Sequence, residues 1–168
     1  QLQGMPLTEE QEARIGTAAP YNLDAWDGYQ AEREVVLGMA RQLDKNLVVL
    51  AGDTHNAWAN NLKDMNGNQV GVEFATASVS SPGLEDYLGL PDAMIADAEQ
   101  GIGLLVDGLD YLNINQRGYM VVTFTQEEAR ANWYFVDTVK SREYTVDNSR
   151  SAARKSLPGA GNRTVDPV

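Results

Sequence analysis

Cysteine is absent from this 168-residue chain, which excludes any disulfide, thiolate metal ligand or cysteine nucleophile within it. Histidine occurs once, as His55. A serine nucleophile activated by one histidine is therefore excluded if His55 serves a metal, because no second histidine exists. Chemistry in this chain must come from carboxylates, amides, hydroxyls, guanidinium groups and that single imidazole.

Basic side chains are scarce, since 13 Lys and Arg stand against 24 Asp and Glu, and the formal net charge is -11. Phosphate contacts need clustered Lys and Arg, so we expect no nucleic-acid-binding surface. No apolar stretch approaches the ~20 residues that a transmembrane helix needs, and no signal peptide is visible. The chain begins with Gln1 in polar sequence. We expect it to be a processed product or a piece of something longer.

The hydrophobic pattern that is present predicts a mixed α/β protein. Near-helical spacing of apolar residues predicts a helix over 24–44, and the unbroken apolar run at 47–51 predicts a buried strand. A second strand is expected at 70–77, and one or two short helices fit 84–104. The first strand lacks the parallel neighbours that normally flank a buried strand, so half of a larger mixed sheet is expected to be missing.

The later part of the chain predicts antiparallel strands and irregular segments. Residues 118–125 and 129–139 are rich in β-branched and aromatic side chains, which predicts a hairpin. Residues 60–69 are polar and include Asn66-Gly67, which favours a turn region. The sequence from Ser149 onward is expected to be irregular.

Gly52-Asp53-Thr54-His55 follows the apolar run directly and is the strongest candidate for chemistry. In open α/β sheets, ligands bind beyond the carboxyl ends of the strands. Asp53 offers a hard oxygen and His55 a borderline nitrogen, which together suit iron, manganese, zinc or calcium. Two ligands are too few for a tight site, so others must come from elsewhere. The alternative is a hydrogen-bonded loop histidine whose tautomer is fixed by Asp53.

Arg117 and Asn115 are weaker candidates, for binding a phosphate group. A guanidinium group can bind phosphate through two parallel hydrogen bonds, which makes Arg117 the better of the two. The alternative is that this segment is only the turn that precedes the hairpin.

The motif at 52–55, followed by Trp58, Ala59 and Asn60, resembles the late motif of the PhoD-like alkaline phosphatases. The wider metallophosphoesterase group carries Gly-His-x-His at the same place, at the end of a strand. Further stretches resemble the same family in the same order, at 21–29, 70–74, 78–83, 115–119 and 133–137. The resemblance covers about residues 20–140.

This resemblance implies the C-terminal part of a metallophosphoesterase-like α/β/β/α sandwich. We expect a lead-in loop at 1–20, the phosphatase portion at 21–140 and a C-terminal tail at 141–168. The implied activity is that of a hydrolase, an alkaline phosphatase acting on phosphate monoesters or diesters. Calcium and iron are the expected metals, with manganese or zinc as alternatives. Asp53 would bind a metal, and His55 would bind a metal, contact the phosphate or donate a proton to the leaving group.

The resemblance also implies that this chain supplies only part of the active site. The family's earlier blocks carry further metal-binding residues, and residues 1–20 show none of them. We therefore expect the isolated chain to be inactive, and its partner to be the missing N-terminal half of the same enzyme or a second copy. The family implies a periplasmic or secreted location. The alternative function is a non-catalytic fragment or interaction domain that lacks a complete metal centre.

Overall fold

The computed structural model describes residues 22–168, so the predicted lead-in loop at 1–20 lies outside the described residues. The chain divides into two units with the boundary between Val36 and Leu37. The described part of the first unit contains the short 3-10 helix η1 (Trp26–Gly28) and the beginning of helix α2 (Gln30–Gln42). The helix predicted at 24–44 is thus confirmed over its central part. The second unit, described below, holds both sheets.

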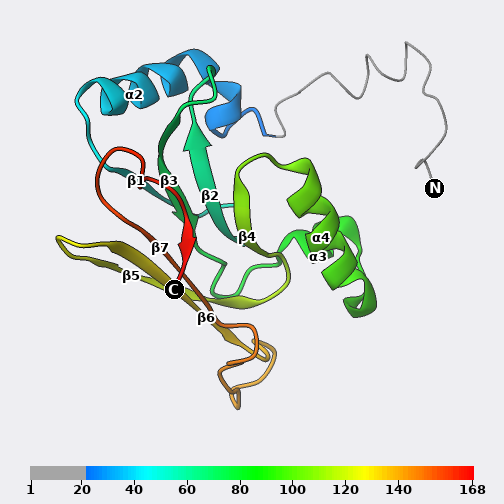
Figure 1. Cartoon of the computed structure of the whole chain (residues 1–168). Coiled ribbons are helices and arrows are strands. Elements are labelled where there is room, and N and C mark those ends of the chain that lie inside the picture. Colours follow the sequence, from blue (N-terminus) through cyan, green and yellow to red (C-terminus); the bar gives the residue numbers. More distant parts are fainter. Residues whose placement is uncertain (1–21) are drawn as a thin grey trace, which may run out of the picture. The chain divides into compact units, whose positions relative to one another are not determined.

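Sheet A has four strands in the order β1-β3-β2-β4 (Figure 1). Their bounds are Leu47–Ala51 for β1, Ala57–Lys63 for β2, Gln69–Ala75 for β3 and Leu109–Asn113 for β4. β1 runs parallel to β3, whereas β2 is antiparallel to both of its neighbours. The mixed sheet that the sequence predicts is therefore confirmed. Helices α3 (Leu84–Leu88), η2 (Asp92–Met94) and α4 (Ile95–Leu105) connect β3 to β4.

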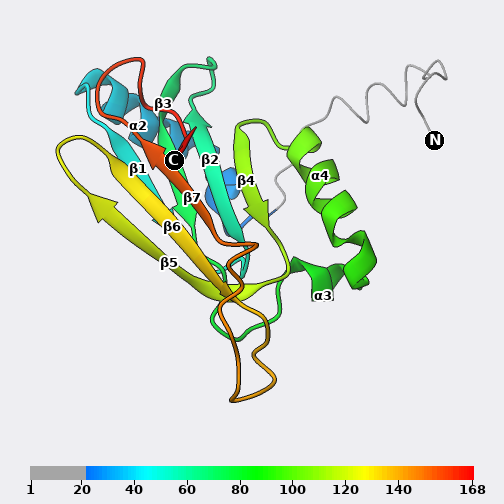
Figure 2. The ribbon, with the colours of Figure 1, turned by 60° about the horizontal axis from the view of Figure 1, so that its bottom comes forward.

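Sheet B is antiparallel, with its strands in sequence order, and Figure 2 shows it layered against sheet A. Its strands are β5 (Arg117–Phe124), β6 (Ala129–Val136), β7 (Ala152–Ser156) and β8 (Asp166–Pro167). The β5–β6 pair confirms the predicted hairpin. The prediction that the sequence from Ser149 onward is irregular was wrong at β7 and β8, whereas the residues between and around these two strands are irregular. β7 has little intrinsic strand pattern, but it pairs with β6, and tertiary pairing outweighs local propensity.

The main hydrophobic core lies between the two sheets. Trp133 of β6 is at its centre and packs edge-on against Phe74 of β3 and at a tilt against Tyr111 of β4. A second cluster joins Leu37 of α2 to Leu62 and Val70 of sheet A. The two sheets of the second unit enclose one core as in a sandwich, and this confirms the predicted fold class.

Two details of sheet A differ from the predictions. Residues 60–63 belong to strand β2 and not to a turn, and the turn is confined to the segment that contains Gly67, whose φ is +79°. β1 was expected to be buried, yet Leu50 is 53% exposed because β1 stands at the edge of the sheet. Within residues 22–168, β1 pairs with β3 alone.

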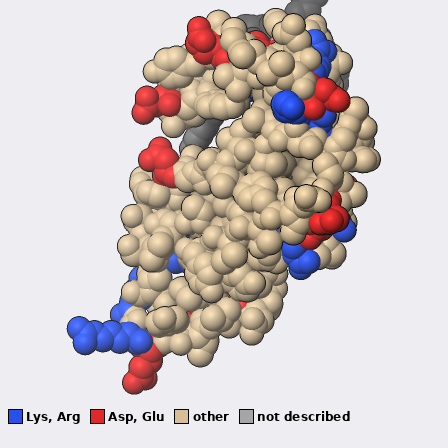
Figure 3. Space-filling view, turned by 90° about the vertical axis from the view of Figure 1, so that its left-hand side faces the viewer, with Lys and Arg blue, Asp and Glu red and all other residues tan. Residues whose placement is uncertain are grey.

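The open edge of β1 and the open edge of β5 lie on the same side of the sandwich. Leu47 and Val48 of β1 line one surface hollow together with Phe124 of β5. Figure 3 views the molecule from the left of Figure 1, and in this view the Lys, Arg, Asp and Glu side chains lie mainly near the margins. This side is therefore poor in charge. In the part of the chain that the structure describes, no helix is long and apolar enough to cross a membrane.

Candidate functional site

The loops that follow β1, β3 and β4 leave sheet A at one end. Ala51, the last residue of β1, is paired with Ala75, the last residue of β3. Ala57, the first residue of β2, is paired with Asn113, the last residue of β4. Since these four strand ends share a register, the loops at 52–56, 76–83 and 114–116 start at the same edge. The predicted site residues Asp53, His55 and Asn115 lie in these loops.

Asp53 and His55 both adopt left-handed backbone conformations, with φ values of +67° and +63°. Side chains other than glycine rarely occupy this region, and each instance costs about 1–2 kcal/mol unless a polar side chain compensates locally. The loop at 52–56 thus contains two strained residues, and they are the two that carry the predicted chemistry. Such strain is typical of functional sites.

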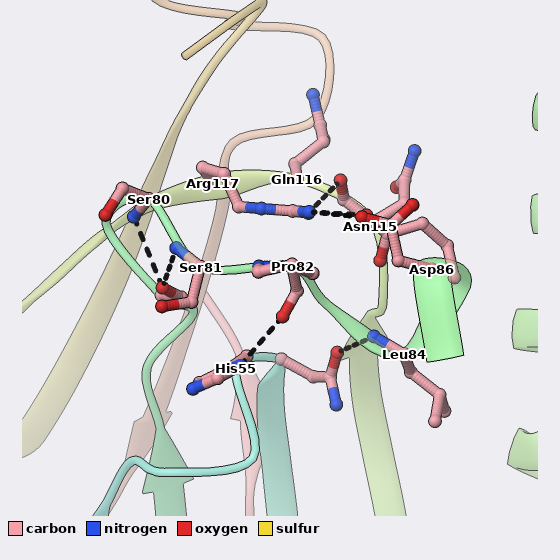
Figure 4. A network of polar contacts seen from close by, with 12 residues as sticks. His55, Ser80, Ser81, Pro82, Leu84, Asp86, Asn115, Gln116 and Arg117 are labelled. Carbon is pink, nitrogen blue, oxygen red and sulfur yellow. Dashed lines mark hydrogen bonds and ion pairs between the residues drawn. The ribbon is translucent and has the colours of Figure 1, made fainter. Parts of the chain in front are cut away.

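The imidazole of His55 is held by a main-chain carbonyl group. Its Nδ1–H donates a 2.7 Å hydrogen bond to the oxygen of Pro82. Because a carbonyl oxygen can only accept, this bond places the proton on Nδ1 and leaves the lone pair of neutral His55 on Nε2. Figure 4 shows the other ring nitrogen pointing away from the Pro82 loop. The tautomer is therefore fixed by Pro82, whereas the sequence suggested Asp53 for this task.

Asn56 ties the two loops together and was not singled out from the sequence. It is 4% exposed. Its Oδ1 accepts a hydrogen bond from the Leu84 N–H at 2.9 Å, and its Nδ2 donates to the Thr54 carbonyl at 2.7 Å. An asparagine between a turn and a buried strand is a signal for this kind of loop contact.

Arg117 forms an ion pair with Glu85, with 2.6 Å between Nη2 and Oε1 (Figure 4 shows the arginine). The two side chains are 12% and 13% exposed. Nη1 of Arg117 also donates to the Asn115 carbonyl at 2.7 Å. Glu85 was missed because it lies far from Arg117 in sequence. Phosphate contact by Arg117 and Asn115 stays a prediction.

The turn before β5 is organised by Asn113 and Gln116. Asn113 Oδ1 accepts hydrogen bonds from the N–H groups of Asn115 and Gln116, at 3.3 and 3.0 Å. Gln116 in turn donates to Asp147 at 2.7 Å. Hydrogen bonds from the Ser149 and Gln116 side chains hold the pKa of Asp147 below its ordinary value of 3.8. The segment therefore forms the turn that the sequence offered as the alternative to phosphate binding.

Metal donors are few at this end of the sheet. Among residues 22–168, no group of three or more His, Asp or Glu side chains is arranged to hold a metal ion. Over the same residues, the Asp53 carboxylate and His55 Nε2 have no hydrogen-bond or ion-pair partner. Within this part of the chain, both donors are therefore available to an added ligand.

The fold of this chain is part of an α/β sandwich. The same fold is found in a solved structure. The solved structure of PhoD superimposes with a TM-score of 0.70 over 92% of this chain and 28% of the PhoD chain, at 24% sequence identity. Alkaline phosphatase D from Bacillus subtilis (strain 168) is 40% identical over 76 residues. That alignment covers 41% of this chain and 13% of the relative, so the chain matches only a small part of either protein.

The family model for PhoD-like phosphatases matches residues 2–133 of this chain. The chain therefore belongs to the PhoD-like phosphatase family. This confirms the resemblance that the motif at 52–55 and the ordered blocks around it predict.

Proposed function

We propose that this chain supplies part of a metal-dependent active site that hydrolyses phosphate monoesters or diesters. The observation that carries the proposal is the loop at 52–56, which presents Asp53 and His55 at the end of sheet A in strained conformations. Family membership supports a phosphatase role in general.

The donor types fit a metal. A carboxylate oxygen and a neutral imidazole nitrogen suit iron, zinc and manganese, and the carboxylate also suits calcium. The Nδ1–H bond from His55 to Pro82 adds to the fit, because metal-binding histidines usually donate their other N–H to a carbonyl or carboxylate group. Asp53 and His55 would each hold a metal, and the remaining ligands would come from outside residues 22–168. When bound, such metals polarise the phosphoryl oxygens and activate the attacking oxygen.

His55 has a second role open to it. In its protonated form the imidazole keeps its bond to Pro82 and carries a proton on Nε2, which it can donate to the leaving-group oxygen. Asn115 and Arg117 are retained as proposed phosphate contacts.

The rest of the site would come from another polypeptide segment. The chain spans 28% of the PhoD chain that it resembles. The open edges of β1 and β5 offer unpaired backbone groups on one charge-poor side. We propose that the remaining part of a PhoD-like phosphatase, or a second copy of this chain, pairs with these edges. By the same family likeness, we expect a periplasmic or secreted location.

Hydrolysis assays test this function. The 168-residue chain is assayed alone and mixed with the remaining part of a PhoD-like phosphatase, on p-nitrophenyl phosphate and bis-p-nitrophenyl phosphate, with calcium and iron present. We expect activity from the mixture only. Asp53→Ala and His55→Ala should each lower that activity by about 10²-fold or more, as for loss of a group that stabilises the transition state. Asp97→Ala, at an exposed position on α4, is the matched control.

The competing function is a non-catalytic fragment or interaction domain. The absence of a third metal donor near the loop, within residues 22–168, is the observation that favours it. If the mixture associates but hydrolyses neither ester, the interaction role holds and the phosphatase proposal is wrong.

A further inference from the structure

Two consecutive residues of β5 hold the two ends of the loop that contacts His55. The N–H of Gly118 donates to the Ser78 carbonyl at 3.0 Å. The Arg117 side chain pairs with Glu85 at 2.6 Å, three residues beyond Pro82. The segment from Ser78 to Glu85 is therefore fastened to the start of β5 at both ends.

The middle of this segment is closely packed. A Cβ atom added to Gly83 would lie 2.5 Å from the Ile114 carbonyl oxygen and 3.2 Å from Asn56 Oδ1. The next N–H, that of Leu84, donates to Asn56. Only glycine therefore allows the chain to pass so close to these groups, and the neighbouring Pro82 carbonyl has little freedom to move.

We propose that Arg117 and Glu85 are positioning residues for His55. Their ion pair fixes the first turn of α3, and this holds the Pro82 carbonyl where it accepts the Nδ1–H of His55. The tautomer that presents an unprotonated Nε2 then follows from the position of the loop. A catalytic benefit from this arrangement rests on the proposed function. The positioning of His55 by the Pro82 carbonyl does not depend on that function.

Stability alone does not account for the pair. Both side chains are largely buried, and Arg117 Nε and Glu85 Oε2 have no hydrogen-bond partner among the described residues. A buried ion pair with unsatisfied atoms is seldom better for stability than two apolar side chains of similar volume. What the pair adds is a defined geometry, because a guanidinium group has a rigid planar fork.

The single histidine makes the test direct, because the ¹⁵N-labelled 168-residue chain gives one pair of imidazole nitrogen signals. The tautomer ratio of neutral His55 is measured in the metal-free wild type and in the double variant Glu85→Gln/Arg117→Met, which removes both charges together. The double variant Asp110→Asn/Arg154→Met, at an ion pair between β4 and β7, is the matched control. Backbone spectra report whether each variant is folded.

We expect Nδ1–H to be the main form in the wild type and in the control. In the Glu85/Arg117 variant the ratio should shift toward Nε2–H by about two- to tenfold, the factor that one lost hydrogen bond corresponds to. An unchanged ratio in the folded variant overturns the positioning role. If that variant does not fold, the tautomer ratio is measured in Arg117→Lys instead. This variant keeps the positive charge but not the planar fork, and an unchanged ratio again overturns the positioning role.

The tautomer ratio needs neither metal nor substrate. A chain without phosphatase activity in any mixture would refute the proposed function and leave the positioning result intact. Conversely, an active mixture with an unchanged tautomer ratio would refute the positioning role alone.

Discussion

The indole N–H of Trp133 donates a 2.8 Å hydrogen bond to the carbonyl oxygen of Ala75, across the interface between the two sheets. Trp133 is fully buried, and Ala75 is the last residue of β3. The loop that carries Ser78 and Pro82 begins just beyond it. This bond therefore anchors the base of the candidate site to sheet B.

Replacing Trp133 with Phe tests this anchor. The change leaves the Ala75 carbonyl without its donor and opens a cavity in the core, so we expect a loss of about 2–4 kcal/mol in the free energy of unfolding. Urea denaturation measures the loss. Trp58→Phe is the matched control, because Trp58 Nε1 has no hydrogen-bond partner among the described residues. Its cost should be about 1 kcal/mol, from lost volume. Equal costs for both variants would show that the Ala75 bond contributes nothing.

The effect of replacing Asp53 on the free energy of unfolding should depend on how well the new residue adopts a positive φ. Its φ of +67° suits Asn and Gly but not Ala. We expect Asp53→Asn to change the free energy of unfolding by less than about 0.5 kcal/mol, and Asp53→Ala to lower it by about 1 kcal/mol. Both variants remove the carboxylate. A difference in stability between them therefore reflects the backbone conformation of the loop and not the loss of the charged group. An alanine variant as stable as the asparagine variant would contradict the strain that we assign to this residue.

Asp64 should make stability depend on acid pH. The side chain of Asn68 donates two hydrogen bonds to its carboxylate, and the N–H groups of Asn68 and Asn66 add two more, which holds the pKa of Asp64 below its ordinary value of 3.8. The carboxylate of Asp64 therefore binds a proton at higher pH in the unfolded chain than in the native chain. The resulting stabilisation is therefore fully present above the unfolded-state pKa and is lost as the pH falls through the native pKa.

Comparison with Asp64→Asn isolates this contribution. Urea unfolding is followed from pH 7 downward for both proteins, since other carboxylates titrate in the same range. We expect the variant to be less stable at neutral pH and the difference to shrink as the pH falls below 3.8, the ordinary value. A difference that is independent of pH would mean that the hydrogen bonds do not favour the charged form.

The open edge of β1 should drive association of the isolated chain. Leu50 is 53% exposed on this edge strand, and exposed apolar groups beside unpaired backbone favour pairing with another chain. We expect Leu50→Glu to weaken self-association in sedimentation velocity, with little change in thermal stability. Met65→Glu, at an 80% exposed position in the β2–β3 turn, is the control. A wild-type chain that is monomeric at high concentration would be evidence against an interacting edge.

Local patterns were sufficient to predict part of the fold. The apolar run gave β1 with its correct bounds, and the β-branched and aromatic segments gave the β5–β6 hairpin. β2 was not fully predicted, because Asn60 and Asn61 in its centre look like turn residues and become strand only by pairing on both sides. β7 and β8 depend in the same way on β6 and on each other.

The candidate site, too, could be predicted from the sequence only in part. Asp53 and His55 could be found from the sequence, because a polar motif directly after a strand lies at a predictable edge of the sheet. The groups that hold them could not. Pro82 meets His55 across 27 residues, and the Glu85–Arg117 pair spans a longer separation. Such contacts follow from the complete topology and leave no spacing signal in a single sequence.

Metal content is the most direct measure of whether Asp53 and His55 belong to a metal centre. The 168-residue chain is mixed with the remaining part of a PhoD-like phosphatase, dialysed, and analysed by elemental mass spectrometry for calcium, iron, manganese and zinc. We expect stoichiometric metal in the wild-type mixture and a clear loss with Asp53→Ala, but not with Asp97→Ala. Equal metal content in the wild-type and Asp53→Ala mixtures would contradict a metal-binding role of Asp53.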